Sequence, residues 1–115
     1  MQPRDLDYLL DILEAARLIQ IFLFNIDQAT FLTDVMRQDA VMRRLEIIGE
    51  ASRRLSEEAR MTLAQFPWSE MISMRNRLIH GYNAVNLDIV WSTVKEDIPL
   101  LITELENILP PEESV

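Results

Sequence analysis

The sequence contains no cysteine, only two glycines and a single histidine among its 115 residues. The lack of cysteine excludes a disulfide framework, a thiol nucleophile and a cysteine-bound zinc or iron–sulfur centre. One histidine per chain also excludes a cluster of histidine metal ligands within one molecule. Two glycines are too few for a glycine-rich phosphate-binding loop, so a nucleotide-binding fold is not expected. We therefore predict that the protein uses no metal and no cofactor.

Long apolar runs are missing as well. No stretch approaches the roughly 20 residues of a membrane-spanning helix, and the first residues show no charged-then-apolar signal region. These features predict a cytoplasmic protein without a membrane partner. Apolar residues still make up 49% of the chain, which is typical of a compact globular fold. The length favours one domain, which we place at residues 1–109, followed by a frayed acidic tail at residues 110–115.

Acidic groups outnumber basic ones, and the net charge of −8 argues against broad, non-specific binding of nucleic acid. The charge is unevenly distributed, however. Residues 1–35 carry two basic and six acidic groups, and residues 81–115 carry one basic and seven acidic groups. Residues 36–80 carry eight basic and six acidic groups. The middle third is therefore the part of the chain that can form a local positive site.

Apolar residues recur at three- and four-residue steps along most of the chain, and no β-strand pattern stands out. This spacing predicts helices, because one face of an α-helix repeats at that interval. We predict an all-α fold, an up-and-down four-helix bundle with a short extra helix. The four main helices are expected at residues 3–26, 37–56, 67–81 and 86–108, and the short one near residues 31–35.

Three single residues refine this arrangement. Gly49 lies beside the apolar stripe of the second predicted helix, where a missing side chain permits close approach of another helix. Asn86 is a good N-cap for the fourth predicted helix. Pro99 lies inside that helix, so it should kink the helix or leave one carbonyl group unpaired.

The third predicted helix carries an arginine in its apolar stripe. Arg75 occupies a position where the helical spacing asks for a core residue. A buried, unpaired guanidinium would cost several kcal/mol, so Arg75 needs a partner or a water-filled site. A polar flank lies next to the stripe, so Arg75 and His80 are expected to border one groove. The stripe comprises Trp68, Met71, Ile72, Leu78, Ile79 and Tyr82, and the flank comprises Ser69, Ser73, Asn76 and His80.

Residues 74–82 combine a guanidinium, the only imidazole and a phenol on one short segment. Arg75 can hold a phosphate with a two-pronged set of donors, and His80 can move a proton near neutral pH. This combination suggests phosphodiester chemistry. A purely structural interpretation stays open: Arg75 can pair with Glu46 or Glu50 of the second helix, and His80 can interact favourably with the dipole at the helix end.

The single histidine constrains any metal-free cleavage of RNA. Such cleavage needs a base for the 2′-hydroxyl and an acid for the leaving 5′-oxygen, and two histidines suit that task at neutral pH. A two-fold dimer that brings two copies of His80 and Arg75 into one cleft is the simple solution. Otherwise one His80 must serve both steps, or water must serve one of them.

The segment at residues 66–82 resembles the signature of HepT-like proteins, a branch of the HEPN superfamily. The family pattern is Arg, four residues, His, any residue, Tyr. In this sequence it is filled by Arg75, His80 and Tyr82, with Asn76 as the polar residue that commonly follows the arginine. No motif position departs from the family pattern.

Two further stretches, residues 38–51 and 88–100, also resemble this family, so the resemblance covers nearly the whole chain in the right order. It implies a helical bundle that forms a homodimer with the Arg-His motifs of both subunits in a shared cleft. It also implies a metal-independent endoribonuclease that is the toxin of a toxin–antitoxin pair and cleaves RNA. In that role His80 is the general acid and base, Arg75 binds the scissile phosphate, and Asn76 orients the phosphate or His80.

The resemblance further implies a partner, an MntA-like minimal nucleotidyltransferase antitoxin that transfers AMP from ATP to Tyr82. AMP adds anionic phosphates and bulk beside Arg75 and His80, so it would compete with an RNA phosphate and block the cleft. An alternative function stays open. In that alternative the chain is a non-catalytic helical adaptor that binds a partner nucleotidyltransferase, and Arg75 is only a structural ion-pair residue.

Overall fold

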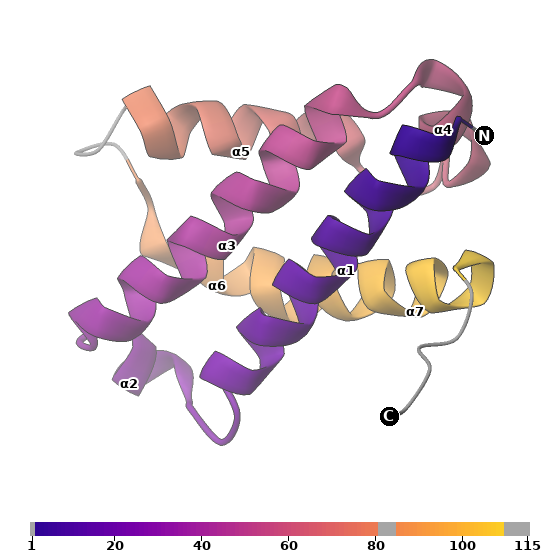
Figure 1. Ribbon diagram of the computed structural model, residues 1–115. Helices are drawn as coiled ribbons and strands as arrows, with labels where there is room; N and C mark the ends of the chain where they lie inside the picture. The colour runs from indigo at the N-terminus through magenta and orange to yellow at the C-terminus, as the bar shows by residue number, and fades with distance from the viewer. Residues whose placement is uncertain (1, 81–84, 110–115) are drawn as a thin grey trace.

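The computed structural model describes residues 2–80 and 85–109, and every regular element in these two ranges is a helix (Figure 1). The all-α class that the sequence predicts is confirmed. The predicted acidic tail, residues 110–115, lies outside the described residues. The elements are α1 (Pro3–Phe22), α2 (Gln28–Phe31), α3 (Val35–Arg54), α4 (Glu57–Thr62), α5 (Trp68–His80), α6 (Leu87–Ser92), the π-helix η2 (Thr93–Asp97) and α7 (Ile98–Ile108).

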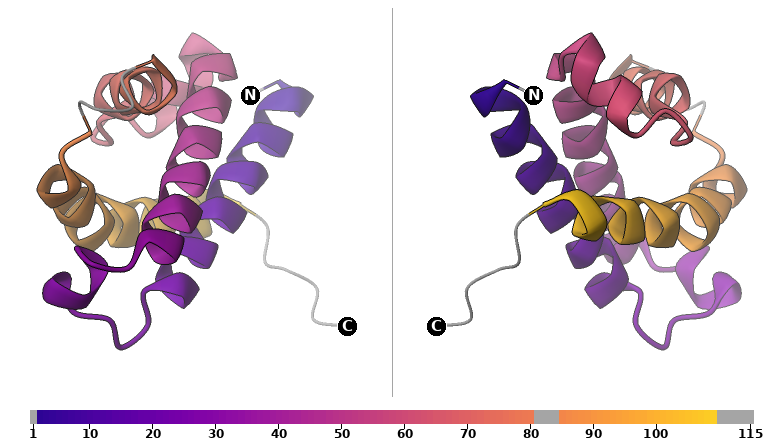
Figure 2. Two further views of the ribbon diagram at one scale, coloured as in Figure 1. Left: turned by 90° about the vertical axis from the view of Figure 1, so that its left-hand side faces the viewer. Right: turned by 90° about the vertical axis from the view of Figure 1, so that its right-hand side faces the viewer.

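Helix α3 is the central element of the fold. It lies between α1, which runs in the opposite direction, and α5 (Figures 1 and 2). The segment formed by α6, η2 and α7 crosses obliquely behind this layer, and α7 packs on α1. The chain thus has the four long helical segments that the spacing predicts, with the short helices α2 and α4 in the connections.

Apolar side chains from all four long segments form one buried cluster. The three- and four-residue spacing places them on the inward face of each helix, which removes their surface from water and stabilises the fold. Fully buried members of this cluster include Leu9, Ile12, Leu45, Ile48, Met71, Ile98, Leu101 and Leu105. Within the described ranges, no helix is long and apolar enough to cross a membrane.

The ends of the first helices differ from the prediction. Helix α1 ends at Phe22 and not near residue 26, because Asn25 adopts a left-handed backbone conformation with φ of 57°. Asparagine tolerates this conformation better than most residues do, and a residue in this conformation cannot continue a right-handed helix. Helix α3 begins at Val35, where the Asp34 side chain accepts a hydrogen bond from the Arg37 backbone N–H at 3.1 Å. The short helix α2 ends at Phe31, whereas the sequence placed it near residues 31–35.

The last helical segment confirms the N-cap predicted at Asn86, and near Pro99 it changes its helical form. The Asn86 side chain caps α6 by accepting hydrogen bonds from the backbone N–H groups of Asp88 and Ile89, at 2.9 and 3.4 Å. Pro99 has no N–H to donate to the preceding turn, and its ring would clash with the carbonyl group four residues earlier. The helix widens into η2 just before Pro99. A π-turn of this kind lets the segment continue past the proline.

A buried carboxylate joins the start of α1 to the start of α4. Asp5 is completely buried, and its two oxygens accept hydrogen bonds from the Ser56 backbone N–H at 2.9 Å and the Ser56 hydroxyl at 2.6 Å. The Gln2 backbone N–H donates a further bond to Asp5 at 3.1 Å. The hydrogen bonds from Ser56 hold the pKa of Asp5 below its usual value. The carboxylate therefore stays ionised and fixes α4, and with it the connection that leads to α5.

Candidate active site

The first residue of α5 fixes the start of that helix. Trp68 Nε1 donates hydrogen bonds to the carbonyl oxygens of Arg60 and Leu63, each at 3.1 Å. The Trp68 ring also lies edge-on to Phe66, with 4.9 Å between ring centroids. These contacts attach α5 to α4 and the loop that follows it. The path of α5 is therefore set before the motif residues begin.

The buried face of α5 is shifted from the predicted stripe. Met71 and Leu78 are buried as predicted, but Ile79 is 41% exposed and the prediction for it is wrong. Met74 is buried in its place, with only 8% of its surface exposed. The two methionines act as packing residues on this face. Helix α5 is thus turned about its axis so that Arg75 borders the buried face and points along the contact with α3.

The reason for this orientation is the contact at Gly49 of α3. A Cβ atom added at Gly49 would lie 2.2 Å from the Arg75 Cβ and 2.9 Å from the Met71 carbonyl oxygen. Both are atoms at or near the α5 backbone and cannot rotate away, so no larger residue fits here without moving one helix. The close helix approach predicted at Gly49 is therefore confirmed, and it places the base of the Arg75 side chain directly on α3.

Each terminal nitrogen of the Arg75 guanidinium has one partner. Its Nη2 lies 2.9 Å from Glu50 Oε2, and its Nη1 donates a hydrogen bond to Asn76 Oδ1 at 3.1 Å. Of the two glutamates proposed as its partner, Glu50 is the one observed, while Glu46 pairs with Arg43. The Arg75 Nε is buried and has no hydrogen-bond acceptor among the described residues. The guanidinium is thus held in one orientation and is only 21% exposed.

Glu50 contacts two further arginines. Arg53 Nη2 lies 3.0 Å and Arg54 Nε 2.8 Å from Glu50 Oε1, so three guanidinium groups share one carboxylate. The hydrogen bonds from Arg53 and then Arg54, with the nearby charges of Arg53 and Arg75, lower the pKa of Glu50 to about 2. Glu50 therefore remains ionised at any pH near neutrality. Arg54 lies four residues after Glu50, a spacing that favours an ion pair on the surface of a helix.

His80 is the last residue of α5, one and a half turns beyond Arg75 along the same helix. Its side chain and the whole of Tyr82 lie outside the described residues, so the distances between the three motif side chains stay a prediction. Three members of the predicted polar flank, Ser69, Ser73 and Asn76, are exposed. The flank that leads along α5 to His80 is therefore open to solvent up to Asn76.

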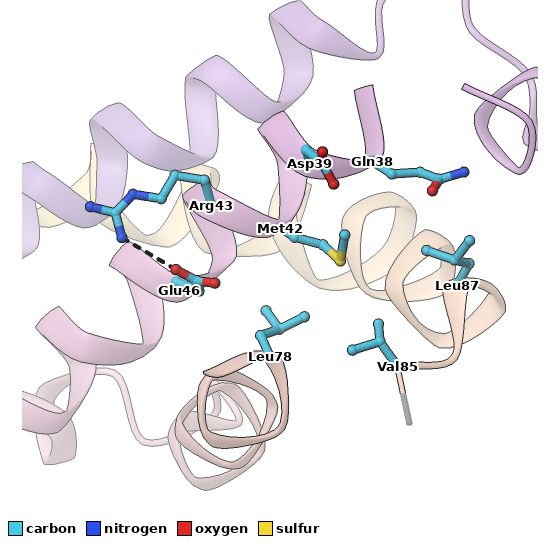
Figure 3. A pocket seen from close by; sticks show the side chains of 8 residues that line it. All are labelled: Gln38, Asp39, Met42, Arg43, Glu46, Leu78, Val85 and Leu87. Atoms are coloured by element: carbon cyan, nitrogen blue, oxygen red, sulfur yellow. Dashed lines mark hydrogen bonds and ion pairs between the residues drawn. The ribbon is translucent and has the colours of Figure 1, made fainter. Parts of the chain in front are cut away.

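A groove opens where α3 and the C-terminal end of α5 diverge (Figure 3). Its volume is about 460 Å³, within the range of small-molecule binding sites. Four apolar side chains and four polar ones line it, and Leu78 contributes to it from α5. A groove of this composition can hold a flat ring by its faces and hydrogen-bond it at its edge. The lining residues are Gln38, Asp39, Met42, Arg43, Glu46, Leu78, Val85 and Leu87.

Comparison with known proteins assigns the chain to a family. The sequence model of the family described as "Ribonuclease HepT-like" matches residues 12–108, a range that contains Gly49, Glu50 and the complete Arg75, His80 and Tyr82 motif. The chain belongs to the ribonuclease HepT-like family. This membership confirms the resemblance noted in the sequence, and the all-helical fold agrees with it.

Chains similar to this one are found in Thermococcus cleftensis and Methanocaldococcus jannaschii. A protein of Thermococcus cleftensis named "Probable ribonuclease HepT" is 46% identical over 102 residues, which cover 89% of this chain and 93% of the relative. A protein of Methanocaldococcus jannaschii named "Putative RNase MJ1380" is 42% identical over 109 residues, which cover 94% of this chain and all of the relative. No solved structure matches this chain significantly.

The groove at this HepT-like site differs from the one that the sequence predicts. Leu78 lines it but Arg75 does not, because its position depends on how far α3 and α5 diverge, and no residue spacing reports that angle. The sequence shows only in part that three arginines share Glu50. It offers Glu50 as one of two possible partners of Arg75, and Arg54 lies four residues after Glu50. It does not indicate that Arg53 joins them. In the part of the chain that the structure describes, no three histidine, cysteine, aspartate or glutamate side chains are grouped to hold a metal ion.

Proposed function

We propose that this protein is a metal-independent endoribonuclease that cleaves RNA with Arg75 and His80, and that it is the toxin of a toxin–antitoxin pair. The observation that carries the proposal is the fixed Arg75 guanidinium, held by Glu50 at 2.9 Å and Asn76 at 3.1 Å on the helix that ends with the only histidine. Membership of the ribonuclease HepT-like family supports ribonuclease activity.

The proposed reaction is an internal transesterification. His80 removes the proton from the 2′-hydroxyl, the 2′-oxygen forms a bond to phosphorus, and the bond from phosphorus to the 5′-oxygen breaks as that oxygen takes up a proton. Arg75 binds the phosphate oxygens and stabilises the charge that develops on them. Asn76, bonded to Arg75, keeps the guanidinium oriented. The products are a 2′,3′-cyclic phosphate and a free 5′-hydroxyl.

We further propose that the active form is a homodimer. One subunit supplies one imidazole, whereas the reaction needs a base and an acid on opposite sides of the phosphorus. A two-fold axis near the C-terminal end of α5 would place a second His80 and Arg75 in the same cleft. Ile79, which is 41% exposed at this end of α5, is an apolar residue that such a contact would cover.

The test of the proposed function uses two versions of one single-stranded RNA, with EDTA present. We expect the purified protein to cut the ordinary RNA and to leave 2′,3′-cyclic phosphate and 5′-hydroxyl ends. The same sequence with 2′-O-methyl groups should remain intact, because it lacks the attacking hydroxyl group. Cleavage of the methylated RNA, or cleavage that EDTA abolishes, would contradict the mechanism.

Tyr82 is the proposed site of regulation. We propose that an MntA-like minimal nucleotidyltransferase transfers AMP from ATP to the Tyr82 hydroxyl, releasing pyrophosphate, and that the added phosphates occupy Arg75 in place of RNA. Intact-mass analysis after incubation with that enzyme and ATP should show added AMP groups and a parallel loss of cleavage. Tyr82→Phe should show neither. AMP groups that persist on the Tyr82→Phe protein would assign the modification to another residue.

The adaptor alternative is favoured by one observation, the ion pair between Arg75 and Glu50. This contact gives Arg75 a structural task that needs no substrate. In the adaptor alternative the protein binds a partner nucleotidyltransferase and cuts no RNA at any concentration. The cleavage test above therefore separates the two functions.

A further inference from the structure

The three arginines around Glu50 form a positive cluster that the proposed reaction does not use in full. Arg53 and Arg54 come from the last turn of α3 and Arg75 from the middle of α5, and each contacts the same carboxylate. Their bonded atoms lie 2.8–3.0 Å from the Glu50 oxygens. The Glu50 contact brings guanidinium groups of two helices into one small region of the surface.

This cluster has more positive charge than its own carboxylate can neutralise. Three guanidinium groups face one carboxylate, in a chain whose net charge is −8. The low pKa of Glu50, about 2, reflects the same surplus of nearby positive charge and hydrogen-bond donors. Like charges held this close repel each other, so an anion that joins them is stabilised.

The structural explanation covers only part of this arrangement. Basic residues in the last turn of a helix interact favourably with the helix dipole, which accounts for Arg53 and Arg54 by themselves. The helix dipole of α3 does not account for the placement of Arg75 beside Arg53 and Arg54. The side chains of Arg53 and Arg54 are each 53% exposed, and Arg54 also bonds to Tyr8 of α1. The donors that these contacts do not use are open to solvent and to a ligand.

We propose that Arg53 and Arg54 form a second phosphate site, next to Arg75, that binds the RNA strand one or more phosphates away from the cleaved bond. Arg75 belongs to both sites, because Glu50 joins it to the other two arginines. The Arg–phosphate contacts are charge-assisted and sequence-independent, so they hold the strand without selecting bases. This inference rests on the proposed ribonuclease function and adds to it the surface along which the strand runs.

The test measures binding of a fluorescent 2′-O-methyl RNA, which the protein should bind but not cut, at several salt concentrations. The main variant is Arg53→Gln/Arg54→Gln, because glutamine keeps a long side chain and a good helix propensity while removing both charges. The matched control is Arg4→Gln/Arg17→Gln, which removes two charges from α1. A second control, Arg53→Lys/Arg54→Lys, keeps both charges, and thermal unfolding checks that each variant is folded.

The expected result is a smaller salt dependence in the main variant. The slope of log K against log salt concentration should fall in magnitude by about 0.7 for each lost contact with a single strand, or about 1.4 for both. The α1 control and the lysine variant should keep the wild-type slope. An unchanged slope in a folded Arg53→Gln/Arg54→Gln protein, or an equal loss in the α1 control, would overturn the proposal. Absence of cleavage in the separate EDTA assay would instead refute the ribonuclease function and leave this binding result intact.

Discussion

Replacement of His80 by alanine should lower the rate of RNA cleavage by about 10²–10⁴-fold, the usual contribution of general acid and base catalysis. The chain contains no other histidine, so no neighbouring imidazole can take over the proton transfer. His80 is the last residue of α5, where a substitution does not disturb the hydrogen bonds of the helix interior. The measurement is single-turnover cleavage of a labelled RNA with EDTA present.

The matched control for His80 lies on the same helix. Ser73→Ala changes an exposed residue of the polar flank and should retain the wild-type cleavage rate. Both variants should show wild-type circular dichroism and thermal unfolding. If the folded His80→Ala protein cleaves as fast as wild type, His80 is not the proton-transfer group and the proposed mechanism is wrong.

A mixing experiment tests whether two copies of His80 act in one cleft. Wild-type and His80→Ala chains, co-refolded in equal amounts, give dimers in which random pairing leaves about one quarter with two intact histidines. If one imidazole is the base and the other the acid, the mixture should retain about one quarter of the wild-type activity. Retention of about one half would mean that each histidine works alone, since half of all His80 residues remain.

The sequence predicted the helices more reliably than the rotation of α5. Its apolar spacing gave Ile79 an inward position, whereas the structure buries Met74 and exposes Ile79. Methionine and isoleucine score alike as apolar residues, so the spacing cannot choose between two neighbouring rotations of the helix. The choice is made by the missing side chain at Gly49, which admits the Arg75 Cβ and thereby sets the rotation of α5.

The partner of Arg75 illustrates a second limit. An arginine in an apolar stripe must be paired, and this argument from desolvation correctly anticipated an acidic residue on α3. The choice between Glu46 and Glu50 depends on where α3 and α5 cross, which is set by Gly49, the immediate neighbour of Glu50. The side-chain geometry of His80 and Tyr82 remains a prediction, because neither side chain is among the described parts of the chain.

Replacement of Arg75 by alanine should lower RNA cleavage by about 10²–10³-fold, the cost of removing one donor that stabilises the charged transition state. Arg75→Lys keeps the charge but loses the planar, two-pronged donor set, so it should restore only part of that activity. Cleavage assays with EDTA measure both effects, and Arg17→Ala, which removes an arginine that pairs with Glu106, is the matched control.

Stability measurements on the same variants decide between a catalytic and a purely structural Arg75. Removal of Arg75 does not leave Glu50 unpaired, because Arg53 and Arg54 still contact it at 3.0 and 2.8 Å. The lost ion pair is worth about 1 kcal/mol, so its loss alone should lower Tm by roughly 5 °C. A large loss of cleavage with a small loss of stability is the signature of a phosphate-binding arginine. A much larger fall in Tm, in a protein that cuts no RNA even as wild type, would instead support the adaptor alternative and assign Arg75 to the joint between α3 and α5.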